Sequence, residues 1–524
     1  MMKQKMVNLN KLKLLIIVAF AFVSFINILE TQNTKFPKGF APDSLWIEAG
    51  KGGVFPAEIN IANVHGRLGI LNSAGEINMK GHPFFEPLGS NGRACVTCHQ
   101  PANGMSVSVE SLRRRWKETH GKDPIFEAID GSNNPKLPQE LESSHSLLLN
   151  RGLFRIGLPF PAKGKDGKTT KPEFTIEVVR DPTGVNLDND FGLKSANPTI
   201  SVFRRPRSVA NMKYVMSPDP TFNIKTGTLA EKDPETGLTV GMNMMADSRH
   251  YTLKAQALDA YDGHLQGHNN LTNTDLQKIV DFENQLYMAQ NMDKWGSNLV
   301  ENGEPSGLGT KAMVKGKVHI LANNNKDPIF HWFETWKKPE TMPKELTKEQ
   351  QEFRASVARG NDIFMFRQFW IRDATHINSI GLGNPVKRSC TTCHNGQMTA
   401  QDLAPGWVDL GTTNYPTWTE PAVNRDKSEL PVFKCTCDKT APPHPYLGRV
   451  IYTTDPGRAL ITGKCADIGS IVMQQFRGLA ARPPYFANGS AKNLREIVDF
   501  YDRRFDMKLS EQDKKDLENF MSVL

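Results

Sequence analysis

Two short strings of cysteine and histidine carry the clearest chemistry in the sequence. Residues 95–99 read CVTCH and residues 390–394 read CTTCH, so each has the form C-x-x-C-H. Two thiols at this spacing can add to the two vinyl groups of one porphyrin, and the adjacent histidine then lies under the iron as its proximal ligand. The residues concerned are Cys95, Cys98, His99, Cys390, Cys393 and His394. The two strings predict two covalently bound c-type haems, with His99 and His394 as iron ligands.

Zinc binding and thiol redox chemistry are the alternative uses of such cysteines. Zinc needs further Cys or His ligands at matched spacing, and none lies close to either string. A thioredoxin-like C-x-x-C pair belongs in a βαβ setting, which the sequence does not indicate. Haem attachment is therefore the interpretation that the residues favour.

The N-terminal segment, residues 1–31, is typical of an export signal. Four lysines precede an apolar run of 16 residues, 14–29. This run is shorter than the roughly 20 residues that a membrane-spanning helix needs, and a basic region before a short apolar one is characteristic of secretion. Because no clear A-x-A cleavage site follows, an uncleaved N-terminal anchor is the alternative. Both interpretations place the remaining chain in the periplasm.

Three cysteines, Cys435, Cys437 and Cys465, lie outside the two strings. An exported protein folds in an oxidising compartment, so one disulfide is expected among them. A bridge between Cys435 and Cys437 would close a very tight ring with strained geometry. We therefore expect Cys465 to pair with Cys437 or Cys435, and one thiol to remain odd.

Composition and length limit the function classes. The 524 residues include 64 Lys and Arg against 56 Asp and Glu, a net charge of +8 without clustered basic stretches. This balance does not indicate nucleic-acid binding. With 23% charged and 39% hydrophobic residues, the chain has the composition of a globular protein and not of a disordered one.

Helix signals surround the two strings. Capping boxes begin at Thr274 and Thr347, a last helix begins at Ser510, and residues 491–505 have a helical pattern. The regions 121–190 and 295–345, rich in Pro, Gly, Lys and Asn, predict long loops or short hairpins. We expect a mainly α protein with two cytochrome-c-like helical haem domains and long loop insertions. The expected boundaries are 32–295 for the first haem domain with an N-terminal extension, 296–345 for a linker or insertion, and 346–524 for the second haem domain.

The stretch 476–490, FRGLAARPPYFANGS, and the helical pattern at 494–501 that follows it resemble the second-haem half of bacterial di-haem cytochrome c peroxidases. That superfamily also contains the enzyme that matures the tryptophylquinone cofactor of methylamine dehydrogenase. The resemblance covers the stretches around both haem motifs and about the last 60 residues. It implies one haem in each of two helical domains, a reactive haem in the first and an electron-transferring haem in the second. It also implies dimers, which are common in the family.

The segment 246–257 is similar to the family segment beside the peroxidatic haem. The family carries a Gln there and a Glu ten residues later, and here these positions are Gln256 and Gln266. An amide cannot titrate as the Glu does. His264 lies two residues away and is the candidate to take over as general acid/base, with a surface histidine as the alternative. The candidate catalytic residues are thus Gln256, His264 and Gln266.

Three further positions depart from the family pattern. Ala246 stands where many members carry a Trp between the haems, and Arg205 stands where an Asn supplies a calcium ligand. A cationic side chain cannot bind calcium, which puts the usual calcium site in doubt. Asn197 replaces the resting-state His ligand of some members, so the resemblance implies an open first haem.

The sixth ligand of the second haem is less defined. The family places Met, Tyr or His shortly before the 476–478 stretch, and Met473 is the nearest candidate, with a core methionine as the alternative. Ser470 occupies the most natural position and is a poor ligand. Arg477 and Arg482 are candidates to contact haem propionates.

The sequence predicts an exported di-haem oxidoreductase that reduces hydrogen peroxide with electrons from a small cytochrome c or a cupredoxin. Because the proton-handling Glu is missing, oxidation or oxygenation of an organic or protein substrate is the alternative within the enzymes. A non-catalytic electron carrier with both irons six-coordinate is the alternative of a different class. No nucleic acid is expected as a partner.

Overall fold

A computed structural model describes most of the chain. The described residues are 46–163, 168–216, 244–250, 252–267, 271–300, 304–316, 332–375, 383–394, 407–415 and 428–524. The predicted export signal at 1–31 lies outside them. Within these ranges, no helix combines the length and the apolar character that crossing a bilayer requires.

The expectation of a mainly α fold is wrong. The described residues form eleven α-helices and six β-sheets, which makes the protein mixed α/β. The helices could be predicted because capping residues and the 3.6-residue periodicity involve residues that are close together in the chain. The strands are short, from two to seven residues, and most pair with segments far away in the chain, so little in the local sequence indicates them.

The elements of the first part run in the following order. They are β1 (Val54–Phe55), β2 (Glu58–Asn63), β3 (Gly66–Asn72), β4 (Ile77–Asn78), α2 (Cys95–Cys98), α3 (Val109–Thr119), α4 (Ser146–Arg151), β5 (Phe154–Pro159), β6 (Phe174–Arg180), β7 (Thr199–Arg204), α5 (Met212–Val215), α6 (Leu253–His264), α7 (Asn273–Gln285), β8 (Leu286–Met292) and α8 (Gly309–Lys315).

The second part continues from the longest helix. Its elements are α9 (Lys348–Phe366), β9 (Phe369–Ile371), β10 (Val386–Arg388), β11 (Trp407–Val408), β12 (Asn414–Tyr415), β13 (Val432–Cys437), β14 (Val450–Thr453), α11 (Ala459–Thr462), β15 (Ile471–Val472), α12 (Leu494–Phe505) and α13 (Glu511–Ser522).

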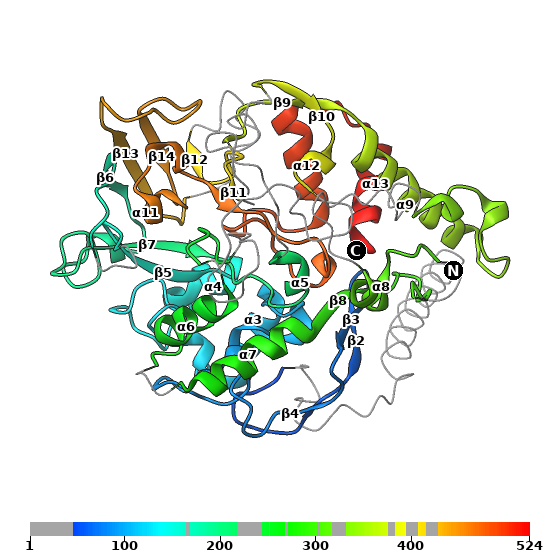
Figure 1. Ribbon diagram of the computed structural model, residues 1–524, viewed down its shortest axis with the longest axis horizontal. Coiled ribbons are helices and arrows are strands. Elements are labelled where there is room, and N and C mark those ends of the chain that lie inside the picture. The colour runs from blue at the N-terminus through cyan, green and yellow to red at the C-terminus, as the bar shows by residue number, and fades with distance from the viewer. Residues whose placement is uncertain are drawn as a thin grey trace, which may run out of the picture.

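Two sheets join segments that are distant in the chain (Figure 1). In the four-stranded sheet, with order β12-β14-β13-β6, β6 from the first part pairs antiparallel with β13 from the second. In the three-stranded sheet, β8 continues directly from α7 and pairs with β3 of the N-terminal hairpin. Strand β13 alternates buried and less buried residues, as a strand with one covered face does.

Helix starts follow the capping residues. Thr347 and Gln350 form the predicted capping box: Gln350 N–H donates to Thr347 Oγ1 at 3.2 Å, and Thr347 N–H donates to Gln350 Oε1 at 2.8 Å. α7 begins two residues earlier than predicted, because Thr272 and not Thr274 accepts a hydrogen bond from Asp275 N–H. These bonds satisfy backbone donors that have no partner inside the helix.

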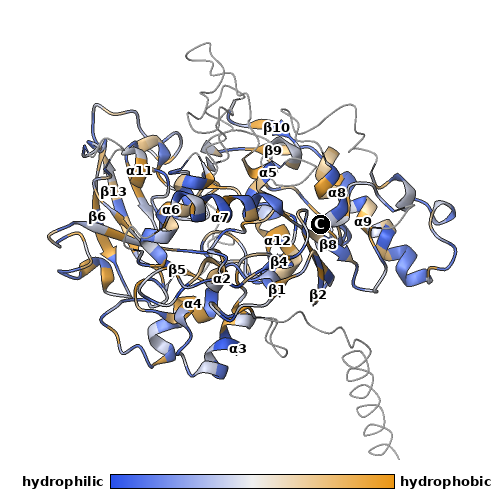
Figure 2. Ribbon diagram, turned by 60° about the horizontal axis from the view of Figure 1, so that its bottom comes forward, coloured by the Kyte–Doolittle hydropathy of each residue, from blue (hydrophilic) through white to orange (hydrophobic). Residues whose placement is uncertain are grey.

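The second motif is surrounded by a core of three helices, α9, α12 and α13. Gly360 of α9 allows the closest approach, since a Cβ at this position would lie 2.0 Å from the backbone oxygen of Asp516 in α13. The rings of Phe364 and Phe520 then meet with centroids 5.4 Å apart. α12 buries Leu494, Val498 and other apolar residues on one side, whereas α3 is largely hydrophilic and lies at the periphery (Figure 2). Helices α9, α12 and α13 thus form the wall behind the second motif.

The disulfide joins Cys437 of β13 to Cys465, with their Cα atoms 5.8 Å apart. Of the two pairings left open by the sequence, the structure contains this one, and Cys435 is the buried free thiol.

Replacing Cys465 with Ser is expected to lower the free energy of unfolding by about 3 kcal/mol, because a cross-link that closes a loop of this length restricts the unfolded chain. Urea unfolding without reductant measures the change. Cys435→Ala, which keeps the bridge, is the control and should lose clearly less. An unchanged midpoint for Cys465→Ser would show that the bridge does not stabilise the fold.

Candidate functional site

The first motif forms a short helix whose histidine is fixed by the backbone. Ala94 N–H donates to Thr97 Oγ1 at 3.0 Å, which caps α2. His99 Nδ1 lies 3.0 Å from the carbonyl oxygen of Met105. Since that oxygen can only accept, Nδ1 carries the proton and Nε2 is left with a lone pair. Burial lowers the pKa of His99 to about 4, so the ring is neutral and able to bind a metal.

A cavity opens beside this motif, and we name it the first cavity. Its empty space is about 1320 Å³, open solvent included. The lining residues that matter for chemistry are Cys95, Cys98, His99, Asp130, Arg249, Gln256, His264 and Glu283. The cavity therefore combines two thiols and a neutral imidazole with several polar side chains.

Two of the three predicted distal residues line the first cavity. Gln256, Ala260 and His264 lie on one face of α6 at a spacing of four residues, and all three line the cavity. Gln266 does not line it. The chain leaves the helix at Leu265, and Gln266 has a left-handed backbone with φ of 52° while its carbonyl accepts a hydrogen bond from the Ser90 backbone.

The sequence did not indicate a buried ion pair beside His264. His264 Nδ1 lies 2.6 Å from Asp130 Oδ2, and Arg93 Nη1 lies 2.5 Å from Asp130 Oδ1. Burial alone would raise the pKa of Asp130, but Arg93 and His264 hold it below its usual range. Asp130 and His264 are 134 residues apart in the chain, and no motif connects them, so no sequence signal could have joined them.

Glu283 is a second residue that the sequence did not single out. It lies on α7 and is 3% exposed, and its Oε2 atom has no hydrogen-bond partner among the residues that the structure describes. Burial raises the pKa of this carboxyl to about 8. A protonatable carboxyl therefore faces the first cavity beside Cys95.

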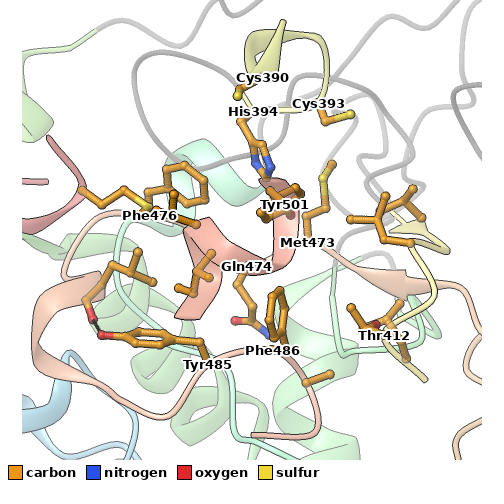
Figure 3. A pocket seen from close by; sticks show the side chains of 18 of the residues that line it. Cys390, Cys393, His394, Thr412, Met473, Gln474, Phe476, Tyr485, Phe486 and Tyr501 are labelled. Atoms are coloured by element: carbon orange, nitrogen blue, oxygen red, sulfur yellow. Dashed lines mark hydrogen bonds between the residues drawn. The ribbon is translucent and has the colours of Figure 1, made fainter. Parts of the chain in front are cut away.

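The second motif lies at the end of the β9–β10 hairpin, in a short 3-10 helix at 390–392. The His394 ring lies 4.7 Å from the Phe476 ring and 6.3 Å from the Tyr501 ring, centroid to centroid. In Figure 3 the imidazole points down into a cavity, and the side chain of Met473 projects toward the same region. This second cavity has about 1590 Å³ of empty space, open solvent included, and mainly apolar walls.

The candidate sixth ligands of the two motifs differ in position. Met473 lines the second cavity, whereas Ser470 does not. Asn197 lies in an exposed loop and does not line the first cavity. Ala246 lines the first cavity and packs against Ile471, which lines the second. Ala246 thus lies between the two cavities, where the resemblance places the family Trp.

The two cavities meet at one junction, since Arg205, Pro206 and Gln474 line both. Arg205 donates to the carbonyl oxygens of Val107 at 2.6 Å and Arg482 at 3.1 Å. The residue at the family's calcium-ligand position is therefore a buried cation bound to backbone carbonyls. The cavities of the two motifs therefore adjoin at these three shared residues.

Two buried arginines, Arg205 and Arg482, and the half-buried Arg207 line the cavities around this junction. Arg205, Arg207 and Arg482 are at most partly exposed, and none forms an ion pair with a carboxylate among the described residues. Burial, together with the Arg482 cation, lowers the pKa of Arg205 to about 9 and of Arg207 to about 10, and burial lowers that of Arg482 to about 10. Buried cations without a counter-charge are unfavourable.

These features fit a haem in each cavity. Each cavity offers two thiols and a histidine at the attachment spacing, and the three arginines supply charge for the two propionates of a haem. Arg482 lines the second cavity, as its predicted role requires, whereas Arg477 does not line either cavity.

Comparison with known proteins yields a distant structural likeness. No family model matches the sequence, and no curated protein matches it. Among solved structures, the chain is similar to a MauG-like protein associated with microbial copper homeostasis, at 14% identity and a TM-score of 0.26, over 78% of this chain and 88% of that one. A TM-score of 0.26 is too low for this likeness to support any conclusion about the chain.

Proposed function

We propose that the protein is an exported di-haem c-type oxidoreductase that reduces hydrogen peroxide. The observation that carries this proposal is the pair of adjoining cavities, each lined by a complete C-x-x-C-H motif, which meet at Arg205, Pro206 and Gln474. One haem would be held by Cys95, Cys98 and His99, and the other by Cys390, Cys393 and His394.

The linings of the cavities support different roles for the two centres. The first cavity contains Gln256, His264 and Glu283, which can donate or accept hydrogen bonds to a small polar substrate. The second is walled mainly by aromatic and aliphatic side chains such as Phe364, Phe476 and Tyr501, and Met473 is available as a thioether ligand there. We assign peroxide reduction to the first centre and electron transfer to the second.

The protein side chains would position the substrate and its protons. A bound haem would supply the iron at which peroxide is reduced, with electrons that come from the donor protein. The Gln256 amide can hold peroxide by hydrogen bonds but cannot change its protonation state. His264, on the same face of α6, can do both.

A surface next to the second motif suits a small electron donor. Trp370 of β9 is 55% exposed, and the adjacent strand carries Lys387 and Arg388, two residues before Cys390. Lys387 Nζ lies 6.0 Å from the Trp370 ring centroid. An aromatic side chain with two cations favours an acidic small cytochrome or cupredoxin.

Haem content tests the proposal. The purified protein is expected to contain two covalent haems per chain by the pyridine haemochrome assay, and Cys390→Ala/Cys393→Ala is expected to retain one. This double variant should no longer take electrons from the donor protein but should keep the visible spectrum of the first centre. Cys435→Ala, which changes a buried cysteine outside both motifs, is the control and should keep two. A wild-type chain without covalent haem would contradict the proposal.

A further inference from the structure

We infer that Asp130 and Arg93 orient His264 so that its Nε2 atom carries the proton during peroxide reduction in the first cavity. Asp130 is then a positioning residue, because it acts through His264. The inference rests on the proposed function. It assigns the proton to the Nε2 atom of His264 and the orientation of that atom to Asp130 and Arg93.

The hydrogen bonds determine which nitrogen of His264 carries hydrogen. An ionised carboxylate can only accept, so the 2.6 Å contact with Asp130 Oδ2 requires His264 Nδ1 to donate. The neutral ring then has its lone pair on Nε2. The other carboxylate oxygen accepts from Arg93 Nη1 at 2.5 Å, which keeps Asp130 in its ionised form.

Arg93, which holds Asp130, is itself fixed by several hydrogen bonds. Arg93 is fully buried, and it donates from Nε to the carbonyl of Pro124 at 2.6 Å and from Nη2 to that of Ile125 at 3.0 Å. The backbone carbonyl of His264 itself accepts from Asn91 Nδ2 at 2.8 Å and from Arg93 Nη1 at 3.2 Å. The end of α6 and the imidazole are therefore held by the same arginine.

The contrast with the other polar groups of the cavity favours His264. Gln256 cannot titrate, and Gln266 does not line the cavity. His264 is 31% exposed at its side chain, so it reaches both the cavity and solvent. The remaining charged or titratable lining groups are the two thiols of the attachment motif, Cys95 and Cys98, together with His99, Arg204, Arg205, Arg207, Arg249 and Glu283. Of these, Glu283 is the rival proton carrier.

The proton balance is simple. Nε2 takes one proton from the peroxide as it binds and returns it to the departing oxygen, which leaves as the first water. The other oxygen takes two electrons from the donor redox protein and two protons from solvent, and leaves as the second water. Asp130 stays ionised throughout and stabilises the imidazolium that forms in between.

Cyanide binding to the ferric protein tests the inference without turnover. Cyanide enters as HCN and must give up its proton to a base in the cavity, so its association rate, followed by the visible absorption change, reports that base. We expect His264→Gln to slow association at pH 7 by about 100-fold and Asp130→Asn by about tenfold. The double variant should be no slower than His264→Gln, because the two residues act as one unit.

Two control variants make the test specific. Asp123 is also a buried carboxylate, with an arginine partner (Arg115) at 2.5 Å, and it does not line the first cavity. Asp123→Asn is expected to bind cyanide at the wild-type rate. Glu283→Gln removes the rival carboxyl, and the inference requires that it slow cyanide association clearly less than His264→Gln does. If Asp130→Asn does not fold, His264→Gln and Glu283→Gln still decide which group takes the proton.

Three results would overturn the inference. A slow Glu283→Gln with a normal His264→Gln would assign the proton to Glu283. Asp130→Asn behaving like Asp123→Asn would limit Asp130 to a structural role. A low-spin first centre that becomes high-spin in His264→Gln would make His264 an iron ligand. In each case wild-type peroxide reduction would persist, whereas absence of that activity would reject the proposed function itself.

Discussion

His99→Gly is expected to lose peroxide reduction almost completely, while the second centre continues to take electrons from the donor protein. The Nδ1 atom of His99 is committed to the Met105 carbonyl, so Nε2 is the atom available to the iron of the first centre. Loss of an outer partner of a metal ligand typically costs about 10- to 100-fold in activity, and loss of the ligand itself should cost more. Steady-state peroxide consumption and stopped-flow spectra with reduced donor measure the two effects.

Added imidazole provides the control for His99→Gly. The glycine leaves space for a free imidazole, which should restore part of the turnover. His394→Gly should show the opposite pattern, because it would interrupt electron supply while a chemically prereduced first centre still consumes one peroxide. If His99→Gly turned over at the wild-type rate, the first motif would not be the reactive centre.

Arg204→Met is expected to lower the free energy of unfolding by about 3 to 5 kcal/mol, because it leaves buried carboxylates without their partner. Arg204 donates to Asp455 at 2.7 and 2.9 Å and to Asp247 at 2.5 Å, and all three side chains are at most 5% exposed. The ion pairs tie β7 to the segment after β14. Denaturant unfolding measures the loss. The control is Lys136→Met, which removes two ion pairs of a largely exposed lysine and should leave the midpoint unchanged.

Stability should also depend on pH through this cluster. Burial alone would raise the pKa of Asp247, but Arg249 and Arg204 hold it well below its usual range. A carboxyl with a depressed pKa in the folded state stabilises the fold fully above its unfolded pKa of about 3.9 and loses this contribution as the pH falls further. Wild-type stability should therefore drop steeply below about pH 4, and Arg204→Met should show a shallower drop. Parallel pH profiles for the two proteins would contradict this explanation.

The parts of the site that could be predicted are those that local sequence encodes. The C-x-x-C-H strings need only neighbouring residues, and Thr347 caps a helix through a residue three positions away. The resemblance led to Gln256 and His264, which share one face of α6 and line the first cavity. Gln266 was matched by its offset, but a single left-handed residue after the helix turns the chain away from that face.

The parts that could not be predicted depend on contacts between distant segments. Asp130 reaches His264, and β6 reaches β13, only after the chain has folded. Glu283 belongs to α7, which the sequence indicated through a capping box, yet nothing in the local sequence distinguishes a carboxyl that is buried beside a cavity from one in water. The fold class was mispredicted for the same reason, since short strands are stabilised by their partners and not by their own pattern.

The most direct test of the central claim is the low-temperature EPR spectrum of the ferric protein as isolated. The claim is that the first cavity holds a reactive centre with an open position and that the second holds a closed electron-transfer centre. We expect one high-spin and one low-spin ferric signal of equal intensity. Two low-spin signals would show that both irons are capped, and would contradict the assignment of the first cavity as the site where peroxide binds.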